Sequence, residues 1–210
     1  MARAPDWPTA TPFVPATRSV SALAHAADGC RGCPLWEPAT QAVFGRGSSS
    51  ARAVLVGEQP GDVEDVKGEP FVGPAGKLLD TALDQAGLDR STLYVTNAVK
   101  HFKFTPRGKR RIHATPDTWE VAACKPWLTA ELEAVRPELV VLLGATAAKA
   151  VFGSTFRVTK SRGTVLPWPT SGGPDALATI HPSAVLRSDD REAALAGLVA
   201  DLKVAAKILA

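Results

Sequence analysis

The sequence predicts an α/β protein in which a parallel sheet of four strands lies between two layers of helices. Four short apolar segments alternate along the chain with segments whose apolar residues recur at helical spacing. Strands and helices that alternate in this order form a parallel sheet covered on both faces, which is a three-layer α/β/α architecture. The chain has 210 residues, of which 45% are hydrophobic and 21% charged, and this is enough to bury the core of such a domain.

Each element is predicted from its own local pattern. The strands are expected at 51–57, 93–97, 139–144 and 176–180, and the helices at 76–86, 116–135, 145–152 and 189–208. Gly87 ends the first of these helices, and the second begins with Thr115 as its N-cap and Pro116 in its first turn. Another helical pattern starts at Ser21. Residues 1–20 are rich in proline and are expected to form a flexible arm, which leaves residues 21–210 as a single domain.

The sequence lacks features that define several classes of protein. The longest apolar run, 139–148, is too short to cross a bilayer, and the N-terminus has no apolar signal segment. We therefore expect a cytoplasmic protein without a membrane partner. The phosphate-binding pattern G-x-x-x-x-G-K-[ST] is missing, which argues against hydrolysis of nucleoside triphosphates.

Polar side chains follow the predicted strands at their carboxyl ends, where open α/β sheets bind ligands. In strand order these segments are Gly57-Glu-Gln-Pro-Gly-Asp62, Thr96-Asn97, Gly144-Ala-Thr146 and His181-Pro-Ser183. Glu58 could act as a base or stabilise a developing cation, and His181 could donate a hydrogen bond to a substrate oxygen as charge builds on it. The alternative is a set of ordinary turns with solvated side chains.

The segment 100–113 contains six Lys or Arg residues and no acidic residue. Such a density of cations favours binding to nucleic acid, because each cation placed near a phosphate releases a counterion. Pro106 and Gly108 favour a surface loop, and a solvated loop without a partner is the alternative. Phe102 and Phe104 either stack on bases or anchor the loop in the core.

His113 ends this basic segment. The charges of Arg110 and Arg111 disfavour protonation of its imidazole, and a neutral imidazole can act as a nucleophile. The alternative is a histidine that is simply exposed.

The chain contains three cysteines, too few for a disulfide framework. Cys30, Cys33 and Cys124 could supply three ligands to a metal site that takes a histidine as its fourth. The candidates for this ligand are His25, His101, His113 and His181. A set of three cysteines and one histidine binds zinc, and histidine can also replace cysteine at an iron–sulfur cluster. The alternative is a buried or reactive thiol pair with an inert core cysteine.

Several motifs, in this order, resemble the uracil-DNA glycosylase superfamily and, within it, the iron–sulfur family 4 branch. They are GEQPG at 57–61, PFVGPAG at 70–76, VTNAVKHFKF at 95–104, Cys124-Lys-Pro126, and HPSAVLR at 181–187. The resemblance extends from about Cys30 to the last helix. GEQPG and the basic segment ending in KRRIH at 109–113 are similar to the UdgX type, whose members become covalently attached to uracil-containing DNA.

The resemblance implies a cofactor and its ligands. His101 stands where ordinary family 4 enzymes carry a cysteine, so the resemblance implies that His101 takes over as the fourth ligand. The cofactor would be an iron–sulfur cluster of the 4Fe-4S kind, with zinc as the alternative, and its role would be structural. The remaining ligands would be Cys30, Cys33 and Cys124.

The resemblance also implies how the base is held. The target base must be flipped out of a duplex or presented in single-stranded DNA, because its glycosidic bond is unreachable in the stack. Phe71 would stack on the uracil ring, Asn97 would hydrogen-bond its polar edge, and His181 would stabilise negative charge on the leaving base. Further residues expected to bind the substrate are Gly57, Asp62 and Ser183.

In the UdgX type, a histidine at the position of His113 captures C1′ of the sugar in place of water. A positioned group competes with water because its effective concentration reaches ~10⁵–10⁸ M. Glu58 would orient this histidine, and Gln59 would hold backbone or base. Residues expected to bind DNA are Lys109, Arg110, Arg111 and Arg187.

The expected partner is uracil-containing DNA, with single-stranded DNA preferred, and the protein is expected to act as a monomer. One alternative is a family 4 glycosylase that turns over and leaves a free abasic site. The other is a metal-stabilised nucleic-acid-binding protein without catalysis.

Overall fold

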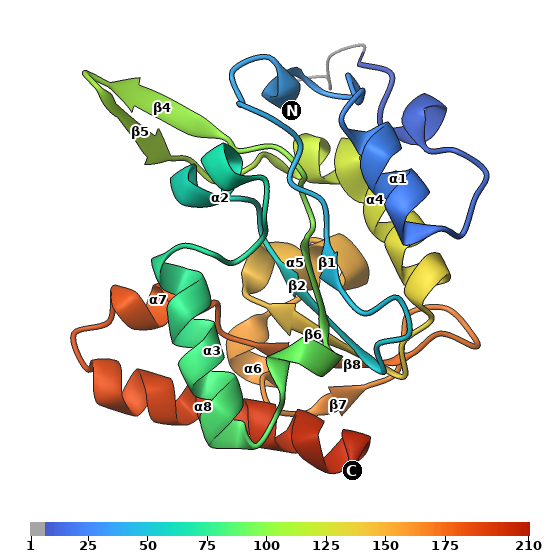
Figure 1. Ribbon diagram of the computed structural model, residues 1–210. Helices are drawn as coiled ribbons and strands as arrows, with labels where there is room; N and C mark the ends of the chain where they lie inside the picture. Colours follow the sequence, from blue (N-terminus) through green and yellow to red (C-terminus); the bar gives the residue numbers. More distant parts are fainter. Residues whose placement is uncertain (1–6) are drawn as a thin grey trace.

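The computed structural model describes residues 7–210, which form a three-layer arrangement around one sheet (Figure 1). The six strands of this sheet follow the order β1-β3-β2-β6-β8-β7, and β4 and β5 form a separate pair. The strands are β1 Arg46–Gly47, β2 Ala53–Gly57, β3 Tyr94–Asn97, β4 Phe104–Arg107, β5 Arg110–His113, β6 Leu139–Leu143, β7 Val165–Leu166 and β8 Asp175–Thr179. The α-helices are α1 Val20–Ala27, α2 Asp62–Lys67, α3 Pro74–Ala86, α4 Thr118–Val135, α5 Ala145–Phe152, α6 Val158–Ser161, α7 Pro182–Leu186 and α8 Arg191–Leu209. Within residues 7–210, no helix combines the length and the apolar character that a bilayer span requires.

The four strands predicted from the sequence form the centre of the sheet and run parallel to one another. β2 pairs with β3 on one side and with β6 on the other, and β6 pairs in turn with β8. Every residue of β2 and β6 is buried, which explains why both strands are apolar throughout instead of alternating. Two short strands that the sequence did not predict, β1 and β7, run antiparallel at the edges. The predicted parallel sheet is confirmed as the core of a larger mixed sheet.

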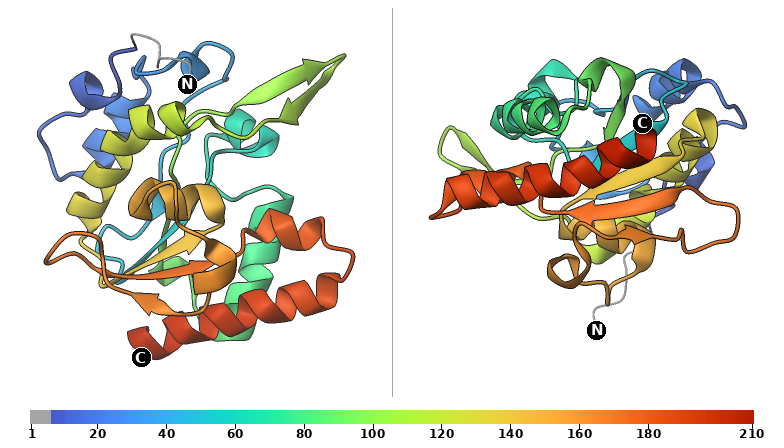
Figure 2. Two further views of the ribbon diagram at one scale, coloured as in Figure 1. Left: turned by 180° about the vertical axis from the view of Figure 1, so that it is seen from behind. Right: turned by 90° about the horizontal axis from the view of Figure 1, so that it is seen from below.

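The two faces of the sheet bury alternate residues of each strand, as the pleat requires. In β2, Val54 and Val56 belong to one core with residues of α1, α4 and α5, whereas Ala53 and Leu55 belong to a second core with α3, α7 and α8. Figure 2 shows the sheet between these two helical layers. The three-layer prediction is therefore confirmed, and the carboxyl ends of the four parallel strands meet at one edge.

The start of α4 differs from the prediction. The helix begins at Thr118 with Asp117 as its N-cap, not at Pro116 with Thr115 as its cap. Asp117 and Glu120 form a capping box, in which Glu120 accepts a hydrogen bond of 2.6 Å from the backbone N–H of Asp117. This reciprocal arrangement satisfies two backbone donors at once, so it defines the first turn.

The segment before α1 packs against α4 where the structure describes it. Residues 1–6 of the predicted flexible arm lie outside the described residues. The next part contains a short 3-10 turn, η1 Thr11–Phe13, and the buried Ala10 donates its backbone N–H to the carbonyl of Ala123 at 2.8 Å. From residue 7 onward the expected arm is thus attached to the domain by this backbone contact.

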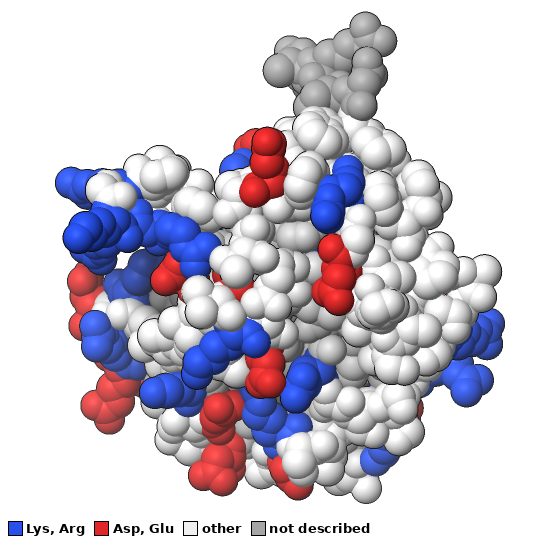
Figure 3. All heavy atoms as spheres, turned by 45° about the horizontal axis from the view of Figure 1, so that its top comes forward, with Lys and Arg blue, Asp and Glu red and all other residues white. Residues whose placement is uncertain are grey.

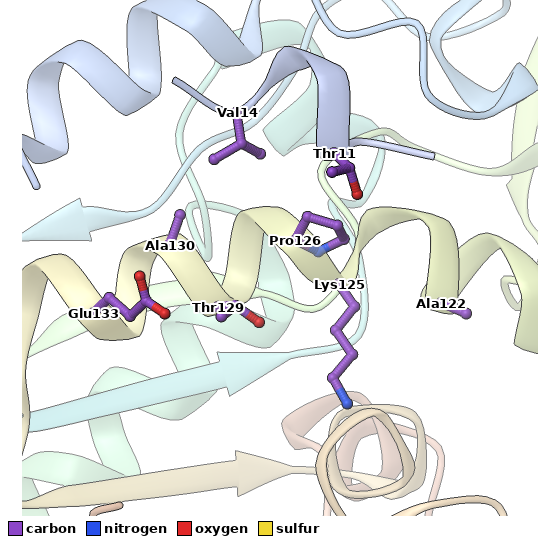
Figure 4. A pocket seen from close by; sticks show the side chains of 8 residues that line it. All are labelled: Thr11, Val14, Ala122, Lys125, Pro126, Thr129, Ala130 and Glu133. Atoms are coloured by element: carbon purple, nitrogen blue, oxygen red, sulfur yellow. The ribbon is translucent and has the colours of Figure 1, made fainter. Parts of the chain in front are cut away.

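A shallow groove runs between the 3-10 turn and α4 (Figure 4). Its lining residues are Thr11, Val14, Ala122, Lys125, Pro126, Thr129, Ala130 and Glu133. The residues predicted to carry function are not among them, so the groove is separate from the candidate site.

The basic segment 100–113 contains a β-hairpin where a loop was expected. β4 and β5 pair antiparallel, with Phe104 opposite His113 and Arg107 opposite Arg110. Gly108 occupies the two-residue turn with φ +58°, a left-handed conformation that glycine adopts without strain. The hairpin projects from the domain beside α2 (Figure 1).

Candidate active site

A group of polar and aromatic side chains meets at the carboxyl ends of the parallel strands, and we call this group the candidate pocket. Gly57 ends β2, Asn97 ends β3, and His181 follows β8. A Cβ atom added at Gly57 would lie 2.3 Å from Asn97 Oδ1 and 2.5 Å from Phe71 Cζ. The ring centroids of Phe71 and His181 are 6.0 Å apart, with 31° between the ring planes. The structure therefore brings together an aromatic face, an amide and an imidazole around a residue that must lack a side chain.

Phe71 has an unusual backbone conformation, and neighbouring residues hold it there. Its φ of +58° is left-handed, which is uncommon for a residue with a bulky side chain. A Cβ atom at Gly76 would lie 1.7 Å from the Phe71 carbonyl oxygen, so the start of α3 needs glycine there. Glu64, buried in α2, accepts a hydrogen bond of 2.9 Å from the backbone N–H of Gly73 and fixes the same loop. These contacts place the Phe71 ring in the pocket.

His181 is held in one tautomer. Its Nδ1 accepts a hydrogen bond of 3.1 Å from the backbone N–H of Ser183, and the Ser183 hydroxyl lies 2.8 Å from the same nitrogen. Because Nδ1 is an acceptor, the ring proton is on Nε2. Burial, with smaller effects from the charges of Arg187 and His113, lowers the pKa of His181 to about 4. The ring is therefore a neutral hydrogen-bond donor at neutral pH. Ser183, predicted to bind substrate, contacts this ring instead.

His113 lies beside Glu58 and Gln59, the two residues predicted to act with it. Its Nε2 is 3.5 Å from Glu58 Oε1 and 3.0 Å from the Gln59 amide nitrogen. Glu58 is held in turn by Thr146, whose hydroxyl donates to Glu58 Oε2. The side chain of His113 is 47% exposed, so a ligand can reach it.

Gln59 joins the two ends of the hairpin. Its amide nitrogen donates to the carbonyl oxygens of Lys103 and Ala114, at 3.1 and 3.0 Å, and its Oε1 accepts from the Lys103 N–H at 3.0 Å. Lys103 precedes β4 and Ala114 follows β5. Because His113 is the last residue of β5, the buried Gln59 side chain determines where the His113 ring enters the site.

Arg111 anchors the hairpin to α2. Its guanidinium contacts Asp62 Oδ1 and Asp65 Oδ2, each at 2.6 Å. It also lies 5.5 Å from the ring centroid of Phe102 and 5.2 Å from that of Phe104. Arg111 was predicted to bind DNA and Asp62 to bind substrate, whereas the structure pairs them with each other. Phe102 is buried and anchors the chain in the core, which decides between the two alternatives for this residue.

The cations at the tip of the hairpin face solvent. Arg107, Lys109 and Arg110 are exposed, and none of them has a carboxylate within ion-pair distance in the described part of the chain. Arg187, which follows α7, is also exposed. Figure 3 shows Lys and Arg side chains gathered around the projecting hairpin.

The three cysteines are free and buried. Burial raises the pKa of Cys33 to about 11 and that of Cys124 to about 12, and the charges of neighbouring cysteines add to both shifts, so the three thiols lie near one another. His101 is also buried, and burial followed by the charge of Arg31 lowers its pKa to about 4. His25, in contrast, is exposed on α1.

The donor chemistry of these four residues suits a metal cofactor, but their arrangement does not suit a single ion. Among residues 7–210, no group of three or more His, Cys, Asp or Glu side chains is placed to hold one metal ion. Zinc needs sulfur donors roughly 4 Å apart, because Zn–S bonds are about 2.3 Å long. Three buried thiols and a buried imidazole are donors of the kinds that both zinc sites and iron–sulfur clusters use.

Two residues that organise the site were missed by sequence reasoning. Glu64 and Asp65 are buried on α2, and each holds a loop or an arginine of the site. Acidic residues in the first turn of a short helix are usually solvated caps, so the sequence carried no signal that these two face inward.

Comparison with known proteins identifies the family that this chain resembles. The family model of the "Uracil DNA glycosylase superfamily" matches residues 44–203. The chain is 41% identical over 164 residues to a type-4 uracil-DNA glycosylase of Thermotoga maritima, covering 78% of this chain and 81% of that protein. It is 40% identical over 162 residues to the type-4 enzyme of Archaeoglobus fulgidus, covering 75% and 78%. A type-5 uracil-DNA glycosylase of Pyrobaculum aerophilum is 38% identical over 116 residues, covering 54% and 46%.

Proposed function

From the premise that this chain belongs to the uracil-DNA glycosylase superfamily, we propose that it excises uracil from DNA and then traps itself on the abasic sugar through His113. Excision of uracil is the activity of the family. The trapping step is the finer proposal, and one observation carries it. A half-exposed imidazole lies 3.5 Å from a carboxylate and 3.0 Å from an amide at the same edge of the sheet as Asn97, Phe71 and His181.

Recognition of the base follows from the pocket residues. The flipped uracil would stack on Phe71 and place its polar edge against the Asn97 amide. Gly57 has no room even for a Cβ atom beside Asn97 and Phe71, and a site packed this closely disfavours thymine, which carries a methyl group that uracil lacks. An Asn amide offers both a donor and an acceptor, which matches the alternating N–H and C=O groups of uracil.

Cleavage is assigned to the fixed tautomer of His181. As the bond between N1 and C1′ breaks, its electron pair leaves with uracil, which becomes an anion. The Nε2–H of His181 donates a hydrogen bond to a uracil oxygen and stabilises this charge, and Ser183 holds the ring while it does so. The sugar is left electron-poor at C1′.

Capture is assigned to His113. The ring nitrogen that carries the lone pair forms a bond to C1′, and the resulting imidazolium then releases its N–H proton to solvent, while the uracil anion takes up a proton. Gln59 and the Arg111 ion pairs hold the hairpin, so the imidazole competes with water at high effective concentration, up to ~10⁵–10⁸ M. Glu58 lies where it can stabilise both the electron-poor sugar and the imidazolium.

A turning-over glycosylase is the second candidate. Relatives named type-4 uracil-DNA glycosylase support it, because their names describe the base-releasing activity. In that case water captures C1′, and His113 is a bystander at the entrance of the pocket.

We also propose that Cys30, Cys33, Cys124 and His101 hold an iron–sulfur cluster. The free buried thiols and the neutral imidazole support this donor set. The cluster would hold the segment after α1 against α4 and the end of β3, a structural role that needs no electron transfer. The cleavage step is therefore carried by the pocket residues alone.

A denaturing gel tests the trapping step. The protein is mixed with uracil-containing single-stranded DNA, and a covalent adduct is expected as a shifted band together with released uracil. His113→Ser should abolish the shifted band while uracil is still released, and the matched control His25→Ser, an exposed histidine on α1, should behave as the wild type. Released uracil without a shifted band in the wild type would favour the turning-over enzyme.

Single-stranded DNA is the proposed preferred substrate, and the protein is proposed to act as a monomer. Base flipping costs least when the base is already unpaired. The same gel, run with a uracil–adenine duplex, should give slower adduct formation than with the single strand. Equal rates would contradict the preference.

A further inference from the structure

A buried ion pair lies directly behind the candidate pocket and has no part in the proposed chemistry. Lys100, three residues after β3, is 1% exposed, and its ammonium group contacts Oε2 of Glu131, which is fully buried on α4. Removing two charges from water costs free energy that a buried pair does not always recover. Such a pair is therefore weak evidence for stability, and its other contacts indicate what it does.

All three hydrogen-bond donors of the Lys100 ammonium are used. Besides Glu131, they reach the Thr96 hydroxyl and the backbone carbonyl of Asn97, each at 2.7 Å. Lys100 thus folds back along its own chain and holds the peptide group of the residue whose side chain enters the pocket.

The carboxylate of Glu131 holds the strand that leads to the pocket. It accepts hydrogen bonds from the Tyr94 hydroxyl at 3.0 Å and from the Thr96 hydroxyl at 2.9 Å, as well as from the Gly45 N–H at 3.0 Å. Tyr94 and Thr96 lie on β3 at alternate positions, so both point to the α4 side of the sheet. Asn97 is the next residue along the strand, and its side chain faces Phe71 on the opposite side.

We propose that Lys100, supported by Glu131, is a positioning residue for Asn97, and that it sets the recognition of uracil from behind the strand. The inference rests on the proposed role of Asn97 in binding uracil. On the pocket side, the Asn97 amide lies close to the bare backbone of Gly57 and to the Phe71 ring, and the peptide group that follows Asn97 donates its N–H to the Gly57 carbonyl at 2.9 Å. The carbonyl of the same peptide group accepts from the Lys100 ammonium, so this peptide is held at both of its polar groups, and Lys100 supplies the contact on the α4 side.

The test removes both charges together, because Lys100→Met alone would leave a buried carboxylate without its cation. In K100M/E131Q the glutamine can still accept from Tyr94, Thr96 or Gly45, while the group that holds the Asn97 carbonyl is gone. Uracil release from single-stranded DNA is measured under single-turnover conditions, both in the wild-type background and in the Asn97→Ala background. In the wild-type background we expect release to slow by about 10- to 100-fold, the effect of a misplacement near 1 Å.

The Asn97→Ala background separates positioning from general damage. If Lys100 acts through Asn97, K100M/E131Q should change the rate there by no more than about twofold, since coupled residues are not additive. R52M/E138Q removes a remote exposed ion pair and should leave the rate unchanged. The melting temperature and visible absorbance of K100M/E131Q should match those of the wild type.

Every remaining outcome of this experiment would contradict one specific claim. A wild-type rate in K100M/E131Q, or the same fold loss in both backgrounds, would overturn the positioning role. If wild type releases no uracil, or Asn97→Ala is as fast as wild type, the proposed function fails instead. Should K100M/E131Q not fold, K100M/E131M makes the same comparison with apolar side chains at both positions, which likewise cannot hold the Asn97 carbonyl.

Discussion

Histidines 113 and 181 show how position decides the chemistry of one residue type. His181 is partly buried, fixed in one tautomer and neutral, which suits a hydrogen-bond donor to a developing anion. His113 is half-exposed at the end of a hairpin, which suits a group that must approach a sugar. The charge of His113 also contributes to the lowered pKa of His181.

The lowered pKa of His181 predicts how stability depends on pH. In the unfolded chain the ring titrates at its ordinary value of 6.5, and in the folded protein at about 4. Between these values the unfolded state binds more protons, so the stability contributed by the neutral buried ring is complete above pH 6.5 and is lost as pH falls toward 4. The loss is on the order of 3 kcal/mol, since one pKa unit corresponds to about 1.4 kcal/mol.

The measurement is urea unfolding of the wild type and of His181→Asn at a series of pH values between 7 and 4. The free energy of unfolding should fall more steeply with acidification in the wild type than in the variant. Parallel curves would show that His181 is not held neutral by the fold.

At the scale of elements, the β4-β5 hairpin is the part of the molecule that sets the proposed nucleophile. Its strand alternation directs Arg111 and His113 to the same face, where Arg111 meets α2 and His113 meets Glu58. The sequence predicted a basic loop there, because Pro106 and Gly108 are turn residues and the strands are short. Gly108 does form the turn, but the anchors at Asp62 and Asp65 are more than forty positions away and could not be read locally.

Loosening the anchor should separate base release from trapping. In R111M/D65N both members of the ion pair are neutral, so no buried charge is left alone, while the hairpin loses its attachment to α2. We expect the ratio of adduct to free uracil to fall on the order of tenfold, because capture depends on close positioning. Denaturing gels quantified beside uracil release give this ratio. Arg107→Met, on the same hairpin but exposed, should leave it unchanged.

The tip of the hairpin should control the salt dependence of DNA binding. K109Q/R110Q removes two exposed cations, and the slope of log K against log salt for single-stranded DNA should decrease by up to about 1.4, since each phosphate contact contributes about 0.7. Fluorescence anisotropy at several salt concentrations measures this slope. The matched variant K203Q/K207Q removes two lysines from α8, and an equal effect there would mean that the tip has no special role.

At the scale of the whole molecule, the central strands and the edge that carries the site follow from the sequence. β2, β6 and β8 are apolar over nearly their full length because helices cover both faces, and the residues after them meet at one edge for topological reasons. The edge strands β1 and β7 have two residues each, too few to show any periodicity. Pairings such as Lys100 with Glu131 join residues that tertiary packing alone brings together.

The proposed cluster joins parts of the molecule that are distant in sequence, and its removal should loosen the N-terminal third. Cys30 and Cys33 follow α1, Cys124 lies in α4, and His101 follows β3. His101→Ala should lose iron and visible absorbance, melt at a lower temperature, and be cut faster by protease between residues 20 and 45. His25→Ala, which changes an exposed histidine, should keep all three properties. If the wild type is colourless and contains one zinc ion, the site holds zinc and not a cluster. If His101→Ala keeps the metal content of the wild type, His101 is not a ligand.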